Sequence, residues 1–167
     1  FRGSEAIRVS HTFENDRTEE TFTRIRELSL RADFDVGAAC VGRIGRRRVD
    51  ALNGQPASLQ QTHDNRYTVV RGRRVLARGK RADGSADLPG KEAGVAVAVW
   101  DLWQNYPKGL CVDGKGITVQ IYPPLKAADY PKGGELEDRL YYPLLDRRYK
   151  FKYGMSRTHE LWFHVRS

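Results

Sequence analysis

The sequence has few cysteines and no long apolar run, and each of these lacks excludes a class of protein. Its two cysteines are Cys40 and Cys111, and neither a C-x-x-C pair nor clustered histidines accompany them. Zinc sites and dithiol redox motifs need such groupings, so neither is predicted, and composition favours two buried free thiols over one disulfide. No segment approaches the roughly 18 apolar residues that cross a bilayer, and the start lacks the layout of a signal peptide. No membrane partner is therefore predicted.

Three familiar enzyme signatures are also missing. The sequence contains no G-x-S-x-G, no H-E-x-x-H and no Walker loop, which argues against the common serine hydrolases, zincin proteases and P-loop nucleotide enzymes. No acidic cluster has the spacing of a calcium loop. We therefore predict no metal site and no cofactor.

Positive charge is plentiful. Lys and Arg number 29 against 21 Asp and Glu, which gives a formal net charge of +8. This excess favours an anionic partner such as nucleic acid, an acidic polysaccharide or an anionic membrane surface, and composition does not choose among them. The run Arg46 to Arg48 is interpreted first as a solvated face and only second, with the arginines of residues 71–74, as part of a nucleic-acid-binding surface.

The length of 167 residues fits one domain, with 40% apolar and 30% charged residues. The chain opens on Phe1 and its single methionine is Met155. We therefore expect residues 1–167 to form a single domain that is a fragment of a larger multidomain protein, although processing would give the same ends.

Short apolar segments rich in Val, Ile, Tyr, Phe and Trp, separated by turn residues, indicate an all-β protein, an antiparallel β-sandwich of roughly eight to ten strands. Residues 94–100 are the most apolar and predict a central strand. Residues 22–30 are expected to pair with residues 7–13 as a first hairpin, and residues 80–91 to form a loop. Further strands are predicted over residues 66–71, 75–79, 117–122, 149–153 and 160–165, an exposed loop or edge over residues 43–53, and a long loop or short helix over residues 127–142.

Two polar and aromatic clusters are candidates for a functional site. Residues 100–109 bring together Trp103, Asn105, Tyr106 and Lys108, and aromatic rings with amides and a lysine suit contact with sugar rings and hydroxyls. The alternative is that the tryptophans only cap the core at a strand end.

Residues 154–160 predict a strand-entry loop that carries Arg157 and His159, a pair able to serve acid and base chemistry. A structural histidine is the competing interpretation. His63 lies in a third polar cluster, residues 60–67, which turn chemistry alone could explain.

Taken together, several of these segments resemble the YetA-like exo-rhamnogalacturonan lyases, in the part of those enzymes that forms a central β-sandwich. The resemblance is carried by residues 59–64, 80–84, 94–97, 103–108 and 158–162. Members of that family also have an N-terminal β domain and a C-terminal α/α toroid, which this chain does not match. The resemblance therefore implies that flanking domains of the parent chain are partners and that the chain alone is an incomplete catalyst, which we expect to be inactive.

The resemblance implies β-elimination at a galacturonate of pectic rhamnogalacturonan. That reaction needs a group that neutralises the uronate carboxylate, a base for the C5 proton and an acid for the leaving oxygen. Neutralisation of the uronate carboxylate is assigned to Asn105, Lys108 and Arg157. The two proton transfers are assigned to His159 and Tyr106. Trp103 and His63 are further substrate-binding candidates, and Trp103 and His159 are expected on one rim.

Two other functions remain open from the sequence. One is a structural or carbohydrate-binding sandwich without chemistry of its own. The other is a basic nucleic-acid binder, which ranks last because no motif of interleaved aromatic and basic residues accompanies the arginines. The acidic polysaccharide is thus the predicted partner.

Overall fold

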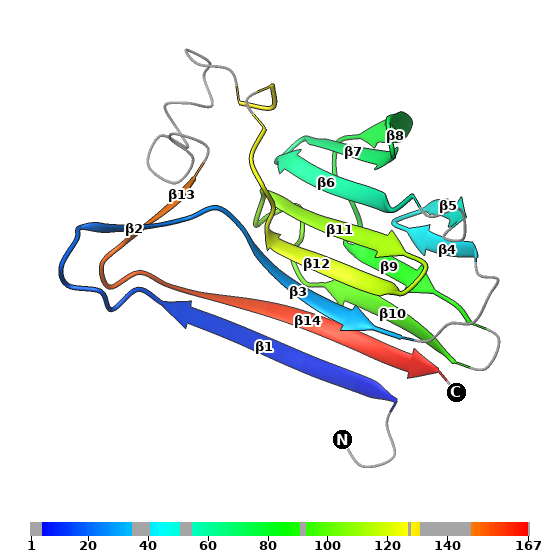
Figure 1. Cartoon of the computed structure of the whole chain (residues 1–167), viewed down its shortest axis with the longest axis horizontal. Helices are drawn as coiled ribbons and strands as arrows, with labels where there is room; N and C mark the ends of the chain where they lie inside the picture. The colour runs from blue at the N-terminus through cyan, green and yellow to red at the C-terminus, as the bar shows by residue number, and fades with distance from the viewer. Residues whose placement is uncertain are drawn as a thin grey trace.

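A computed structural model describes residues 5–34, 41–50, 55–90, 93–126, 128–130 and 148–166, and every regular element within these ranges is a β-strand (Figure 1). The strands form two six-stranded antiparallel sheets and one two-stranded ribbon. Sheet I has the order β1 (Ala6–Glu14), β14 (Ser156–Arg166), β10 (Gly94–Val99), β9 (Ser85–Leu88), β4 (Val41–Ile44) and β5 (Arg47–Asp50). Sheet II has the order β3 (Leu28–Asp33), β12 (Gly116–Tyr122), β11 (Lys108–Asp113), β6 (Ala57–His63), β7 (Arg66–Arg71) and β8 (Arg74–Gly79). The ribbon pairs β2 (Phe22–Ile25) with β13 (Tyr149–Lys152).

Sheets I and II pack face to face around one apolar core, so the predicted all-β sandwich is confirmed. Strand alternation sends every second side chain inward. Val97 and Leu161 of sheet I and Leu110 and Val119 of sheet II are all at most 2% exposed. Burying each such side chain contributes about 1.5–3 kcal/mol, and this burial holds the two sheets together.

Several predicted strands are confirmed. Residues 94–99 form β10, which lies inside sheet I between β14 and β9. The hairpin of β7 and β8 turns at Gly72, whose φ of 55° favours glycine. The strand that begins near Ile117 ends at Tyr122, directly before Pro123, because proline cannot donate to a strand ladder.

Other predictions about the strands were wrong. Residues 22–30 do not pair with β1: a bend at Arg26 divides them into β2, which pairs with β13, and β3, which pairs with β12. The segment expected to be a loop over residues 80–91 contains β9, and residues 43–53 contribute to the edge hairpin of β4 and β5. The described residues hold fourteen strands, more than the roughly eight to ten predicted. The prediction was too low because four-residue strands carry too little alternation to be recognised.

The two cysteines differ in what can be said of them. Cys111 carries a free thiol, is half-buried, and burial raises its pKa. Cys40 lies outside the described residues, as does nearly all of the loop or short helix expected over residues 127–142. The prediction of two buried free thiols therefore stays a prediction for Cys40.

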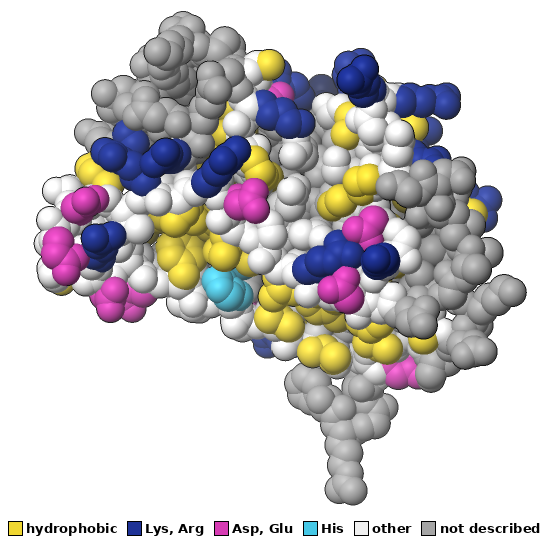
Figure 2. Space-filling model, viewed as in Figure 1, with side chains coloured by type: hydrophobic (Ala, Val, Ile, Leu, Met, Phe, Trp, Pro, Cys, Tyr) yellow, Lys and Arg dark blue, Asp and Glu magenta, His cyan; other side chains and the backbone are white. Residues whose placement is uncertain are grey.

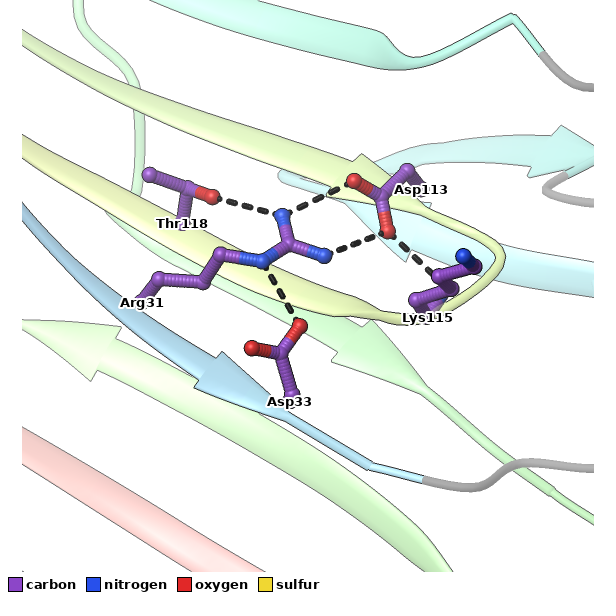
Figure 3. Close-up of polar contacts among 5 residues, drawn as sticks. All are labelled: Arg31, Asp33, Asp113, Lys115 and Thr118. Carbon is purple, nitrogen blue, oxygen red and sulfur yellow. Dashed lines mark hydrogen bonds and ion pairs between the residues drawn. The ribbon is translucent and has the colours of Figure 1, made fainter.

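Arg31 ties together three strands on the outer face of sheet II (Figure 3). Its Nη1 and Nη2 donate to the Asp113 carboxylate at 2.8 and 3.0 Å, and its Nε donates to Asp33 at 2.7 Å. Nη1 also donates to Thr118 at 3.0 Å. Because the guanidinium stabilises the ionised carboxylate, the pKa of Asp113 lies below its usual value.

Arg31→Gln is expected to lower the free energy of unfolding by about 1 kcal/mol, the upper part of the range for solvent-accessible ion pairs, because the variant loses a bidentate pair. Asp113 contributes stability above its unfolded pKa that is lost as the pH falls through its lowered folded pKa, so the loss should shrink in acid. Urea denaturation at neutral and acidic pH measures both effects. Arg17→Gln is the control, since Arg17 pairs with Glu19 in an exposed loop; equal losses in the two variants would contradict a special role for Arg31.

Candidate functional site

Aromatic rings from both sheets and the ribbon gather at one end of the sandwich. The Tyr122 ring centroid lies 4.8 Å from that of Tyr149, 5.2 Å from that of Phe151 and 5.8 Å from that of Phe13. Tyr149 is fixed by donating its hydroxyl hydrogen to the Pro123 carbonyl at 2.6 Å. This cluster anchors the ribbon to the sandwich and forms a rigid apolar wall.

Asn15 holds the same ribbon by hydrogen bonds. Its side chain is 7% exposed, its Nδ2 donates to the Phe151 carbonyl at 2.8 Å and its Oδ1 accepts from the Thr23 hydroxyl at 2.7 Å. Its backbone bonds Met155 and Gly154, at the entry to β14. One buried amide thus joins both ribbon strands to the start of β14.

A cavity of about 830 Å³ lies against this wall, within the size range of ligand sites. In the space-filling view, hydrophobic side chains reach the surface next to lysine and arginine side chains (Figure 2). The lining comes from the segment before β11, from the ribbon, and from β12 and β14: Thr21, Phe22, Gln104, Asn105, Tyr106, Pro107, Tyr122, Tyr149, Lys150, Phe151, Lys152, Met155, Arg157 and His159.

The segment before β11 is organised by Asp101. Asp101 adopts a left-handed φ of 51°, and its carbonyl accepts from the backbone N–H of Asn105 at 2.9 Å and from Asn105 Nδ2 at 3.2 Å. Its carboxylate accepts from Gln104 Nε2 at 2.9 Å. This turn presents two amide side chains and then Tyr106 to the cavity.

The charge around the cavity is positive. Lys150, Lys152 and Arg157 line it, and none of the described lining residues is acidic. The Arg157 side chain is exposed, and its guanidinium makes no hydrogen bond or ion pair with a described residue. The cavity therefore favours an anionic ligand that also has an apolar face.

Lys108 and His159 meet across the sandwich behind the cavity. Both side chains point inward, Lys108 from β11 and His159 from β14, and they are 1% and 7% exposed. Lys108 Nζ lies 3.0 Å from His159 Nδ1 and donates to the Ile121 carbonyl at 3.2 Å. His159 Nε2 lies 3.3 Å from the Tyr122 hydroxyl. A chain of polar atoms thus runs from a buried amine to a hydroxyl at the cavity.

Burial shifts the pKa values of Lys108, His159 and Tyr122 in the direction that favours the neutral form of each group. Burial, with a smaller effect of Arg157, lowers the pKa of Lys108 to about 7. Burial, followed by the charge of Lys108, lowers the pKa of His159 to about 3. Burial raises the pKa of Tyr122 to about 12. Near neutral pH, His159 and Tyr122 are therefore uncharged while Lys108 is divided between its two forms.

The form of Lys108 decides the direction of the hydrogen bonds. A charged Lys108 can only donate, so Nδ1 of His159 accepts and its Nε2–H donates to Tyr122. A neutral Lys108 can accept from Nδ1–H, which frees Nε2 to accept the hydroxyl hydrogen of Tyr122. The second arrangement makes Tyr122 a better acceptor for a proton from the cavity.

The structure brings together only part of the site predicted from the sequence. Asn105, Tyr106, Arg157 and His159 line the same cavity, whereas Lys108 lies behind His159 and outside the lining. Arg157 and His159 also lie within β14, so the expected strand-entry loop is wrong, because β14 begins at Ser156.

Trp103 and His63 lie elsewhere. Trp103 lines a second cavity, where the Arg81 guanidinium stacks 4.1 Å from its ring centroid, so it does not share the cavity of His159. The His63 ring stacks 5.2 Å from the ring of Tyr130 and lies 2.9 Å from Arg66 Nη2. His63 lines neither of these two cavities.

Sequence reasoning missed Tyr122 as a member of the site. Simple alternation along β12 places it on the outer face, with Thr118 and Gln120. The register of β12 against β3 shifts between Gln120 and Tyr122, so that Tyr122 pairs with the inward-facing Leu28. The pair of prolines after Tyr122 marked only the end of the strand, and nothing in the sequence signalled the shift of register before it.

No protein-family model matches the chain, and no curated protein matches it either. Within the described ranges, no group of three or more His, Cys, Asp and Glu side chains is placed to hold a metal ion. The same ranges contain no helix with the length and apolarity needed to cross a membrane.

Proposed function

We propose that the large cavity binds a uronate unit of an acidic polysaccharide and that the protein takes part in its cleavage by β-elimination. The proposal is supported mainly by one observation: the cavity joins Arg157, whose guanidinium has no ion-pair partner among the described residues, to the neutral pair of Tyr122 and His159. Pectic rhamnogalacturonan is the proposed substrate, in keeping with the resemblance to exo-acting lyases of that polymer.

The uronate carboxylate needs a cation or amide donors beside it, because removal of the C5 proton puts more negative charge on that group. Arg157 offers a guanidinium with no carboxylate partner in the described residues. Asn105 uses one N–H of its amide on Asp101 and keeps a second for the ligand. Lys108 is buried outside the lining and acts only through His159.

Proton transfer is assigned to the hydroxyl groups. The Tyr122 oxygen takes the C5 proton while its own hydrogen passes to Nε2 of His159 and the Nδ1 hydrogen of His159 passes to neutral Lys108. The electrons of the C5–H bond form the C4–C5 double bond. The C4–O bond breaks, and the leaving oxygen takes a proton from the Tyr106 hydroxyl. Because Nε2 accepts only when Lys108 is neutral, the rate should rise as the pH passes through about 7, the pKa of Lys108.

A carbohydrate-binding sandwich without chemistry is the second candidate. It is favoured by the raised pKa of Tyr122, which keeps the hydroxyl protonated and makes it a good hydrogen-bond donor and a weak base. The same cavity would then hold a uronate by Arg157 and the aromatic wall alone.

Ultraviolet absorbance of the new double bond separates these functions. The chain is incubated with rhamnogalacturonan oligosaccharides both alone and within a longer polypeptide that contains it. In the form that is active, Arg157→Gln is expected to lower the rate of elimination by about 10²–10³-fold, as loss of one key electrostatic donor does. Arg78→Gln removes an equally exposed arginine from β8 and should leave the rate unchanged.

The other outcomes are informative. Binding without new absorbance supports the carbohydrate-binding function. Activity only in a longer polypeptide that contains this chain would assign one wall of the cleft to a neighbouring domain. If neither the chain nor the longer polypeptide binds the oligosaccharides or produces new absorbance, the proposal is contradicted.

A further inference from the structure

The structure has a second cavity of about 370 Å³. Its lining includes Trp103, which directly precedes Gln104 of the first cavity's lining in the sequence. It is formed by the turn between β4 and β5, by inner residues of β6 and β7, and by the segment before β9. Its lining is Ile44, Gly45, Arg46, Arg47, Leu59, Tyr67, Val69, Arg81, Ala82, Asp83 and Trp103.

Three arginines in this lining make no ion pair with a described residue. The Arg81 guanidinium is held over the Trp103 ring, with 4.1 Å between its central carbon and the ring centroid. Stacking leaves the N–H groups at the edge of a guanidinium available for a planar anion such as a carboxylate. The side chains of Arg46, on the turn, and Arg47, at the start of β5, are exposed and make no hydrogen bond or ion pair with a described residue.

Asp83 narrows the kind of anion. Its Oδ1 accepts from the backbone N–H and the hydroxyl of Ser85 at 3.1 and 3.0 Å, and its Oδ2 makes no hydrogen bond with a described residue. A carboxylate oxygen in the wall can accept a sugar hydroxyl, and its charge repels a chain of phosphates more strongly than a singly charged uronate. The Tyr67 ring, fixed against Gly79, adds an apolar face.

We infer that this second cavity is a subsite for another carboxylated sugar of the acidic chain whose uronate the first cavity binds. The inference rests on the proposed function for the identity of that chain. Arg81, Arg46 and Arg47 hold the carboxylate, Trp103 and Tyr67 contact the ring, and Asp83 accepts a hydroxyl. A ligand long enough to pass the segment from Trp103 to Pro107 occupies both cavities.

The test follows the indole N–H signals in a two-dimensional ¹H–¹⁵N spectrum. The chain has three tryptophans, Trp100, Trp103 and Trp162, so three signals are expected, and Trp103→Phe identifies one. Oligogalacturonate is expected to shift the Trp103 signal, whereas the galacturonate monomer, at a concentration that fills only the first cavity, shifts signals of β14 and not that of Trp103.

Arg46→Ser with Arg47→Ser is expected to weaken oligogalacturonate binding about fivefold, as the loss of two exposed ion pairs predicts. Arg73→Ser with Arg74→Ser is the matched control, because it removes the same charge from the exposed turn between β7 and β8. Binding of the monomer should be unchanged in both double variants.

Equal weakening in the two double variants would mean general charge attraction and overturn the inference. An unshifted Trp103 signal with saturating oligogalacturonate would also overturn it. So would a double variant of Arg46 and Arg47 that loses more affinity for single-stranded DNA than for oligogalacturonate. These outcomes leave the elimination assay, which reports on the first cavity, unaffected. Failure of that assay with a shifted Trp103 signal would instead contradict the chemistry and keep the second subsite.

Discussion

Tyr122→Phe is expected to lower the rate of elimination by about 10²–10⁴-fold, the usual contribution of a positioned acid or base. The variant keeps the ring that packs against Tyr149 and Phe151 and removes only the hydroxyl that lies 3.3 Å from His159 Nε2. The substrate therefore still binds, so kcat should fall while KM stays nearly constant. Initial rates from ultraviolet absorbance across a range of substrate concentrations measure both constants.

Two checks make this result specific. Tyr153→Phe alters an exposed tyrosine, 54% accessible, that does not line the cavity, and should keep full activity. Urea denaturation should show that Tyr122→Phe changes the free energy of unfolding by only about 1 kcal/mol, the net value of one hydrogen bond. An unchanged kcat in a folded Tyr122→Phe variant would exclude Tyr122 from proton transfer.

Lys108→Met is expected to remove a strong pH dependence of stability. The folded pKa of Lys108 is about 7, below the ordinary lysine value of 10.5. Between these values the unfolded chain binds a proton that the folded chain does not, so the free energy of unfolding rises with pH by about 1.4 kcal/mol per pH unit. Below about pH 7 both states bind the proton and this contribution levels off. Methionine has no titrating group, so the slope should disappear.

Denaturation by urea at several pH values between about 7.5 and 9.5 measures that slope, the window lying within the range that the shifted pKa defines. Lys115→Met is the control: its side chain is exposed, so the slope of the parent protein should remain. The comparison depends on slopes, so it holds even if loss of the bonds to Ile121 and His159 changes stability at every pH. A flat profile in the parent protein would show that Lys108 is charged when folded.

The sequence was sufficient to predict the fold class because alternation and turn residues are local signals. Residues 66–79 show both, and they form the expected hairpin. The pairing of β1 with β14 joins residues at opposite ends of the chain, such as Val9 with Leu161, and no local pattern specifies such a partner. The ribbon of β2 and β13 was missed for the same reason.

The candidate site was predicted in part. Asn105, Tyr106, Arg157 and His159 were identified from residue type and were found around one cavity. Lys108 was expected to touch the substrate, yet strand alternation turned it into the core beside Leu110. The alternation along this strand could be recognised in the sequence. Burial of Lys108 was nevertheless not predicted, because lysine side chains are rarely buried. Tyr122 depended on a bulge, which shifts the facing of a strand without a clear sequence signal.

The buried amide of Asn15 has a thermodynamic consequence for binding. Because it bonds both strands of the ribbon and the entry to β14, the cavity wall is already in place before a ligand arrives. A preformed wall loses little conformational entropy on binding, so more of the contact energy remains as affinity. The ligand would also bind only the folded chain, so its binding should raise the thermal stability of the ribbon and the sandwich as one cooperative unit.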